Sequence, residues 1–92
     1  MTSTGRPIAL TLYGRSWCHL CENMLHALQP LRQVFDFQVT LVDVDSAPEL
    51  ESRFGEWVPV LMMGDVELCH YHLDEPRVRT ALAAASGIPP ET

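Results

Sequence analysis

The segment LYGRSWCHLC, residues 12–21, contains two cysteines separated by two residues and lies where one structural pattern gives way to another. Residues 8–13 (IALTLY), which overlap its start, are apolar, β-branched or aromatic and are bounded by Pro7 and Gly14, which predicts a strand. From position 20 to position 31, apolar residues recur at helical spacing. The C-x-x-C pair therefore lies at a junction between a strand and a helix.

The position of this pair favours redox chemistry. Cys18 falls at the helix start, where unpaired backbone N–H groups and the positive end of the helix dipole stabilise a thiolate. We therefore expect the pKa of Cys18 to lie below the free value of about 8.5. Cys21 lies one turn deeper and is suited to attack a mixed disulfide rather than to start one. His19 would raise the oxidising power when protonated if its ring lies near the sulfurs; the alternative is a solvent-facing ring.

Two other uses of the cysteines stay open. The first is a zinc or iron–sulfur module, in which Cys69 or a histidine completes the ligand set of Cys18 and Cys21. The chain has no second C-x-x-C and no H-x-x-x-H, so we expect no metal site. The second is a redox-silent module that binds partner chains. Cys69 itself is either a third redox thiol or a buried bystander.

The central part of the chain alternates further strands and helices. Pro30 predicts a kink or an irregular last turn in the first helix. Residues 37–44 (FQVTLVDV) have apolar side chains at both odd and even positions, which predicts a strand covered on both faces. Residues 46–49 (SAPE) form a capping-box pattern before a short helix, which ends near Phe54 with Gly55 able to take a positive φ.

The last third predicts a hairpin and a final helix. Strands over 60–63 and 66–71 flank the two-residue turn Gly64–Asp65. Asp74 is the expected cap of a helix that Gly87 and two prolines end. The order is β-α-β-α-β-β-α, so the fold class is α/β, with a mixed four-stranded sheet flanked by helices.

Four segments carry a resemblance to a known family: LYGRSWCHLC, VDVD (42–45), WVPVL (57–61) and GDVEL (64–68). They resemble the thioredoxin superfamily, and particularly a bacterial glutaredoxin-like family of uncharacterised function. The similarity extends from about Ile8 to Ala85. It implies a thioredoxin-like fold and a thiol–disulfide oxidoreductase.

The resemblance also implies site residues. Cys18 corresponds to the nucleophilic cysteine and Cys21 to the resolving one. Pro59 matches a cis-proline that faces the pair, and Val58 offers its backbone to an extended substrate. Arg15 stands where glutaredoxins place a basic residue that meets the glutathione carboxylate; otherwise it is a surface arginine.

The chain departs from classical glutaredoxins at three places. His19 replaces a proline, Trp57 replaces a threonine, and the bulky residues 69–74 replace a Gly-Gly segment that binds glutathione. We therefore expect no resident cofactor and keep glutathione only as a co-substrate. Trp17 and Trp57 border the expected site, where they either cover the core or contact the substrate.

Composition limits the partners. With 92 residues, the chain is expected to form one domain over 1–92, with tails at 1–6 and 88–92. The formal net charge is -6, which argues against nucleic-acid or anionic-membrane binding. We expect a cytoplasmic protein, because no signal-peptide pattern is present, and we also expect a monomer. Its substrate would be a disulfide-containing protein or small molecule, and its reductant glutathione or a thioredoxin-type protein.

Overall fold

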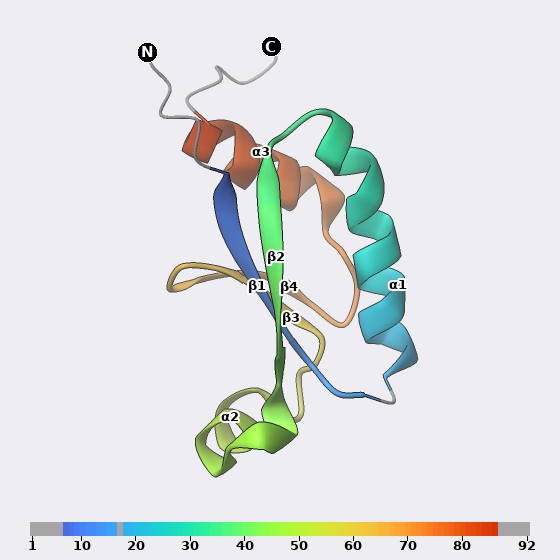
Figure 1. Cartoon of the computed structure of the whole chain (residues 1–92), viewed down its shortest axis with the longest axis vertical. Helices are drawn as coiled ribbons and strands as arrows, with labels where there is room; N and C mark the ends of the chain where they lie inside the picture. Colours follow the sequence, from blue (N-terminus) through green and yellow to red (C-terminus); the bar gives the residue numbers. More distant parts are fainter. Residues whose placement is uncertain (1–6, 17, 87–92) are drawn as a thin grey trace.

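The structure is a computed structural model that describes residues 7–16 and 18–86. Trp17 and the two expected tails lie outside these residues, as does the expected helix stop at Gly87. The elements follow in the order β1 (Ile8–Gly14), α1 (His19–Leu28), β2 (Phe37–Asp43), α2 (Pro48–Phe54), β3 (Val60–Met63), β4 (Val66–His70) and α3 (Glu75–Ser86). This order confirms the predicted fold class (Figure 1).

The strands form one mixed sheet in the order β2-β1-β3-β4. Strands β1 and β2 are parallel, and their connection through α1 is the crossover that the sequence predicted. Strand β3 runs antiparallel to both β1 and β4. Gly64 has a φ of 62° in the β3–β4 turn, a conformation that glycine adopts without strain.

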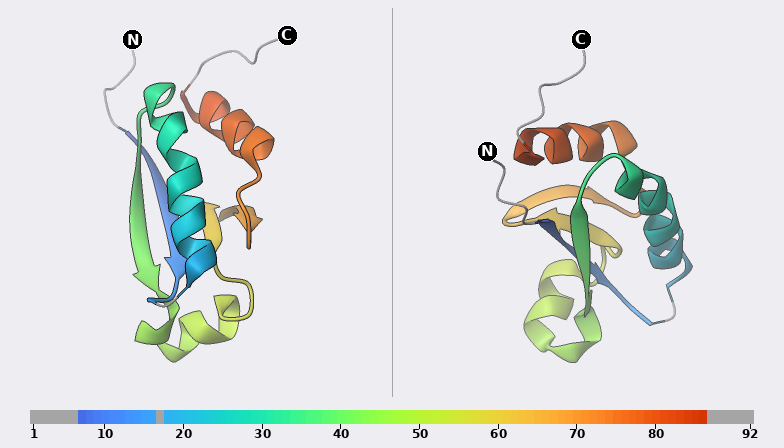
Figure 2. Two further views of the ribbon diagram at one scale, coloured as in Figure 1. Left: turned by 90° about the vertical axis from the view of Figure 1, so that its right-hand side faces the viewer. Right: turned by 45° about the horizontal axis from the view of Figure 1, so that its top comes forward.

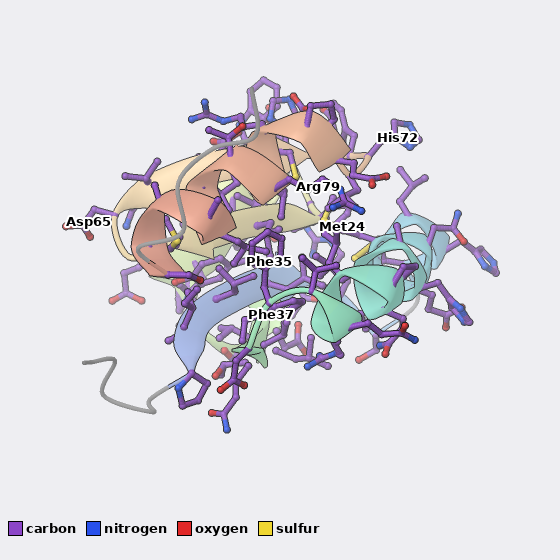
Figure 3. All side chains as sticks on the ribbon, turned by 90° about the horizontal axis from the view of Figure 1, so that it is seen from above. Met24, Phe35, Phe37, Asp65, His72 and Arg79 are labelled. Carbon is purple, nitrogen blue, oxygen red and sulfur yellow. A yellow bond between two sulfur atoms is a disulfide. The ribbon has the colours of Figure 1, made fainter. Side chains whose placement is uncertain are left out.

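Helices cover both faces of the sheet (Figure 2). Helices α1 and α3 cover one face and enclose the larger cluster of buried side chains, while α2 covers the other face around Phe54. Figure 3 shows Met24, Phe35 and Phe37 gathered in the interior, whereas Asp65 and His72 lie at the periphery. No helix in the described part of the chain is long and apolar enough to cross a membrane.

Two helix ends follow the sequence closely. Helix α1 stops at Leu28, and the 3₁₀ helix η1 (Gln29–Gln33) continues from it, which confirms the irregular turn expected at Pro30. Asp74 caps α3, because its Oδ1 accepts a hydrogen bond from the backbone N–H of Arg77 at 3.2 Å.

Three expectations about the middle of the chain were wrong. Strand β2 is not covered on both faces: it pairs with β1 alone, so it is an edge strand, and Leu41 is 62% exposed. The capping box at Ser46 does not form, because its hydroxyl donates to the carbonyl of Asp43 at 2.6 Å within the 3₁₀ helix η2 (Val44–Ser46). Gly55 has a φ of -56°, since its N–H still bonds to the carbonyl of Glu51.

Candidate active site

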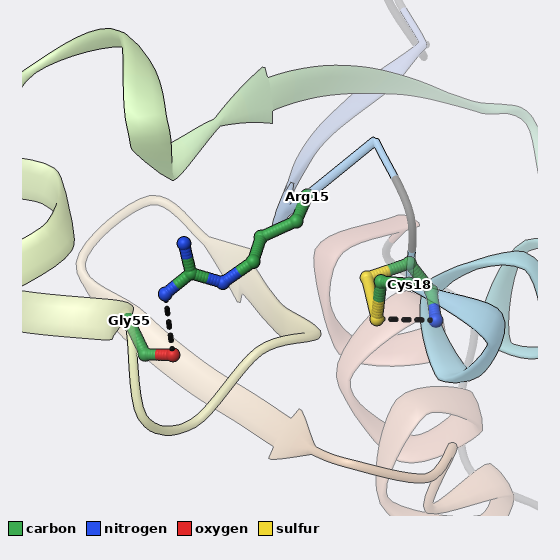
Figure 4. Close-up of a disulfide and its surroundings, with 4 residues drawn as sticks. Arg15, Cys18 and Gly55 are labelled. Atoms are coloured by element: carbon green, nitrogen blue, oxygen red, sulfur yellow. Dashed lines mark hydrogen bonds between the residues drawn. A yellow bond between two sulfur atoms is a disulfide. The ribbon is translucent and has the colours of Figure 1, made fainter.

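The two cysteines of the C-x-x-C motif form a disulfide at the start of α1 (Figure 4). Their Cα atoms are 5.2 Å apart, within the usual range for a disulfide. Cys18 is the N-cap residue, and its Sγ accepts a hydrogen bond from the backbone N–H of Cys21 at 3.1 Å. The sulfur of Cys18 thus occupies the place where a helix end stabilises negative charge.

The two cysteines differ in their exposure to solvent. Cys18 is half-buried, whereas Cys21 is only 7% exposed. This difference matches the order of attack expected from the sequence, with Cys18 as the sulfur that meets the substrate. The assignment of nucleophile and resolving cysteine stays a prediction.

Gly14 leaves no room for a side chain beside the disulfide, a role that its sequence position did not reveal. A Cβ atom added at Gly14 would lie 2.7 Å from the Sγ of Cys21, which is closer than real Cβ atoms approach a neighbour. The sequence marked Gly14 only as the end of a strand. A glycine at a strand end can also indicate a close approach to another group, and that second meaning applies here.

Arg15 is bound within the protein. Its guanidinium donates to Glu51 at 2.6 Å, to the carbonyl of Gly55 at 3.0 Å and to Asp45. The hydrogen bond to Glu51 is the largest of several interactions that raise the pKa of Arg15. Arg15 therefore ties the loop before Cys18 to α2, as Figure 4 shows for Gly55. Its predicted contact with a glutathione carboxylate stays a prediction.

The partners of Arg15 were not predicted from the sequence. They lie 30 to 40 positions further along the chain, so no local pattern connects them to the cysteine loop. The sequence signal that existed was the concentration of acidic residues on either side of position 48. Without the fold, nothing indicated which basic residue these carboxylates would meet.

The segment before β3 has the expected backbone geometry. The Val58–Pro59 peptide bond is cis, as the family resemblance implied, and the carbonyl of Pro59 accepts a hydrogen bond from the backbone N–H of Tyr71 at 2.9 Å. Trp57 is 47% exposed, and its ring meets the edge of His70 with centroids 5.4 Å apart. Substrate contacts at these residues stay predictions.

The third cysteine and the histidine of the motif lie in different environments. Cys69 is 9% exposed and pairs with Leu61 across β3 and β4, and burial raises the pKa of its thiol. His19 is exposed in the first turn of α1. Within residues 7–16 and 18–86, no three histidine, cysteine or acidic side chains gather in a way that could hold a metal ion.

Comparisons with known proteins agree with this geometry. The glutaredoxin-like domain (DUF836) matches residues 9–83. An uncharacterized protein of Mycobacterium tuberculosis (strain ATCC 25618 / H37Rv), Rv0508, is 30% identical over 86 residues, which cover 87% of this chain and 89% of the relative.

Solved structures give the same result. The solution structure of protein Ne2328 from Nitrosomonas europaea is 36% identical and has a TM-score of 0.77; the match covers 89% of this chain and 99% of Ne2328. A mutant thioredoxin from Halobacterium salinarum NRC-1 shares the fold, with a TM-score of 0.58 at 23% identity, over 89% of this chain and 77% of that protein. The chain therefore belongs to the glutaredoxin-like family (DUF836), and it has a thioredoxin-like fold.

Proposed function

We propose that this protein is a thiol–disulfide oxidoreductase that uses Cys18 and Cys21. The observation that carries the proposal is the disulfide at the start of α1. Cys18 is half-buried and its sulfur accepts a hydrogen bond from a backbone N–H, whereas Cys21 is buried. A helix N-terminus lowers the pKa of a cysteine, and only the thiolate is nucleophilic. The arrangement therefore favours Cys18 as the sulfur that attacks.

The reaction proceeds in two exchanges. In the reduced protein, the Cys18 thiolate attacks one sulfur of a substrate disulfide, which forms a mixed disulfide and releases the other half of the substrate as a thiolate. The thiolate of Cys21 then attacks the Sγ of Cys18, which forms the Cys18–Cys21 bond and releases the second substrate thiol. Two electrons pass from the protein to the substrate. A thiol reductant then returns two electrons to the pair and is itself oxidised to a disulfide.

Substitution of each cysteine tests the proposal. Cys18→Ser should abolish disulfide reductase activity, whereas Cys21→Ser should accumulate a mixed disulfide that mass spectrometry detects. Cys69→Ser is the matched control, because it removes a thiol and leaves the pair intact. Full reductase activity in Cys18→Ser would refute the proposal.

The reduction potential of the pair, measured together with the pKa of Cys18, separates this function from its alternatives. A lowered pKa and a reversible disulfide support an oxidoreductase. A pKa near the free value, with no disulfide formed under mild oxidation, would instead support a binding module that uses the exposed Trp57 surface. Stoichiometric zinc or iron in protein purified under reducing conditions would support a metal module.

A further inference from the structure

A groove of about 320 Å³ opens beside the disulfide, between α1 and the paired strands β1 and β2. Its volume lies at the lower end of the range for small-molecule sites. Cys18 and Cys21 line one end of the groove, and Leu12, Leu25 and Leu41 line its length. An apolar groove thus leads to the redox sulfurs.

The groove follows from the register of the two strands. Leu12 on β1 lies beside Leu41 on β2, and Gly14 lies beside Asp43. Leu12 is 2% exposed and buried beneath α1, whereas its neighbour Leu41 is 62% exposed. Helix α1 therefore covers β1 at this level but leaves the edge strand open. Among the large apolar residues that the structure describes, Leu41 is the most exposed.

The charges at the groove disfavour an anionic ligand. Its charged lining residues are Glu22, Asp43 and Arg15. The guanidinium of Arg15 already bonds to Asp45 and Glu51, so it offers little free positive charge to a ligand. Glutathione carries two carboxylates and one ammonium group and has no long aliphatic chain. A neutral ligand with an aliphatic chain fits both the apolar walls and the acidic rim.

We propose that this groove binds a neutral small-molecule dithiol with an aliphatic chain, which reduces the Cys18–Cys21 disulfide. The inference rests on the proposed function and names the class of its reductant. The chain lies along Leu12, Leu25 and Leu41, which brings the thiols to the sulfurs at the end of the groove. Removal of this chain from water favours binding.

The electron transfer balances without another reactant. One ligand thiolate attacks the Sγ of Cys18, the bond to Cys21 breaks, and Cys21 leaves as a thiolate that takes up a proton. The second ligand thiolate attacks the ligand sulfur of this mixed disulfide, and Cys18 leaves as a thiolate. The ligand ends as a cyclic disulfide and loses two electrons, which reduce the protein pair.

A matched pair of dithiols tests the proposal. Dihydrolipoamide and dihydrolipoate have the same aliphatic chain, which ends in a neutral amide in one and in a carboxylate in the other. The oxidised protein is mixed with each dithiol at equal concentration, and its free thiols are quenched with an alkylating reagent and counted by mass spectrometry. We expect dihydrolipoamide to react faster, by up to about fivefold, the effect of one like charge at contact distance in water.

Two variants test whether the dithiol binds in this groove. Leu41→Asp replaces an apolar side chain of the groove with a hydrated carboxylate, and the lost contact with the aliphatic chain of dihydrolipoamide should slow the reaction about fivefold or more. Val66→Asp is the matched control, because Val66 is a 51% exposed residue on the opposite edge strand, β4, and does not line the groove. It should react as the parent protein does. Octanamide, which has the chain but no sulfur, should shift the methyl NMR signals of Leu12, Leu25 and Leu41.

The outcomes separate the inference from the function on which it rests. Equal rates for the two dithiols, or a rate with dihydrolipoamide that is unchanged in Leu41→Asp, would overturn the groove proposal and leave the oxidoreductase intact. Absence of octanamide shifts at the three leucines would likewise overturn it. A disulfide that exchanges with no thiol, including glutathione and a thioredoxin, would overturn both proposals.

Discussion

Replacement of Gly14 by alanine should make the Cys18–Cys21 disulfide easier to reduce. The added Cβ would lie 2.7 Å from the Sγ of Cys21 while that sulfur is fixed in the disulfide. In the reduced protein, Cys21 is free to rotate about its Cα–Cβ bond and relieve the contact. Overpacking in a well-packed site costs about 1–3 kcal/mol, and this cost falls on the oxidised form. Since about 30 mV corresponds to 1.4 kcal/mol for two electrons, we expect the reduction potential to rise by roughly 20–65 mV.

The potential is measured by equilibration with redox buffers of known potential, followed by alkylation of free thiols. Urea unfolding of both redox forms provides an independent check. The substitution should cost the oxidised form about 1–3 kcal/mol more unfolding free energy than it costs the reduced form. The two measurements must agree, since they close one thermodynamic cycle. An unchanged or lower potential, in a variant whose two redox forms both fold, would refute the steric argument.

Three further predictions concern the loop, the third thiol and the core. Arg15→Ala should speed hydrogen exchange in α2, because Arg15 holds Glu51 beside the cysteine loop. Arg15→Lys should restore only part of the protection, since lysine lacks the guanidinium fork. Unchanged exchange in Arg15→Ala would contradict this role. The pKa of Cys69 is raised in the folded protein, so its thiol ionises first in the unfolded chain, above about pH 8.5. The unfolding free energy of the oxidised protein should therefore fall as the pH rises above this value. In urea titrations at alkaline pH, Cys69→Ala should show a smaller fall. Leu82→Ala removes a side chain that is 0% exposed and should cost about 2–5 kcal/mol in urea unfolding, whereas Val34→Ala, at a 54% exposed site, should change stability by less than about 0.5 kcal/mol.

Local patterns predicted the secondary structure well because they act over a few residues. The C-x-x-C motif after a strand predicted the helix start at Cys18, and Pro30 predicted the irregular end of that helix. The exposure of β2 was not predictable in the same way. Apolar residues at both odd and even positions are typical of a central strand, but the strand order places β2 at the edge of the sheet. That order depends on pairing between distant segments.

The candidate active site was likewise predictable only where the pattern is local. The sequence identified Cys18 and Cys21 because their spacing and position are local. It did not identify the bonds of Arg15 to Asp45 and Glu51, which form only when α2 folds beneath the end of β1. It also did not reveal the groove at Leu41, because the groove depends on the register of two strands and the path of a helix above them.

The burial of Cys69 bears on the accuracy of repeated redox cycles. A protein with three thiols can close three different disulfides, and each wrong pairing would remove a molecule from the cycle. Cys69 is buried in β4, where burial raises the pKa of its thiol, whereas Cys21 already lies against the Cys18 sulfur. In the proposed reaction, a substrate bonded to Cys18 would therefore be released by Cys21 and not by Cys69. In the proposed cycle, the burial of Cys69 in the core thus disfavours incorrect disulfides with the cysteines at the start of α1.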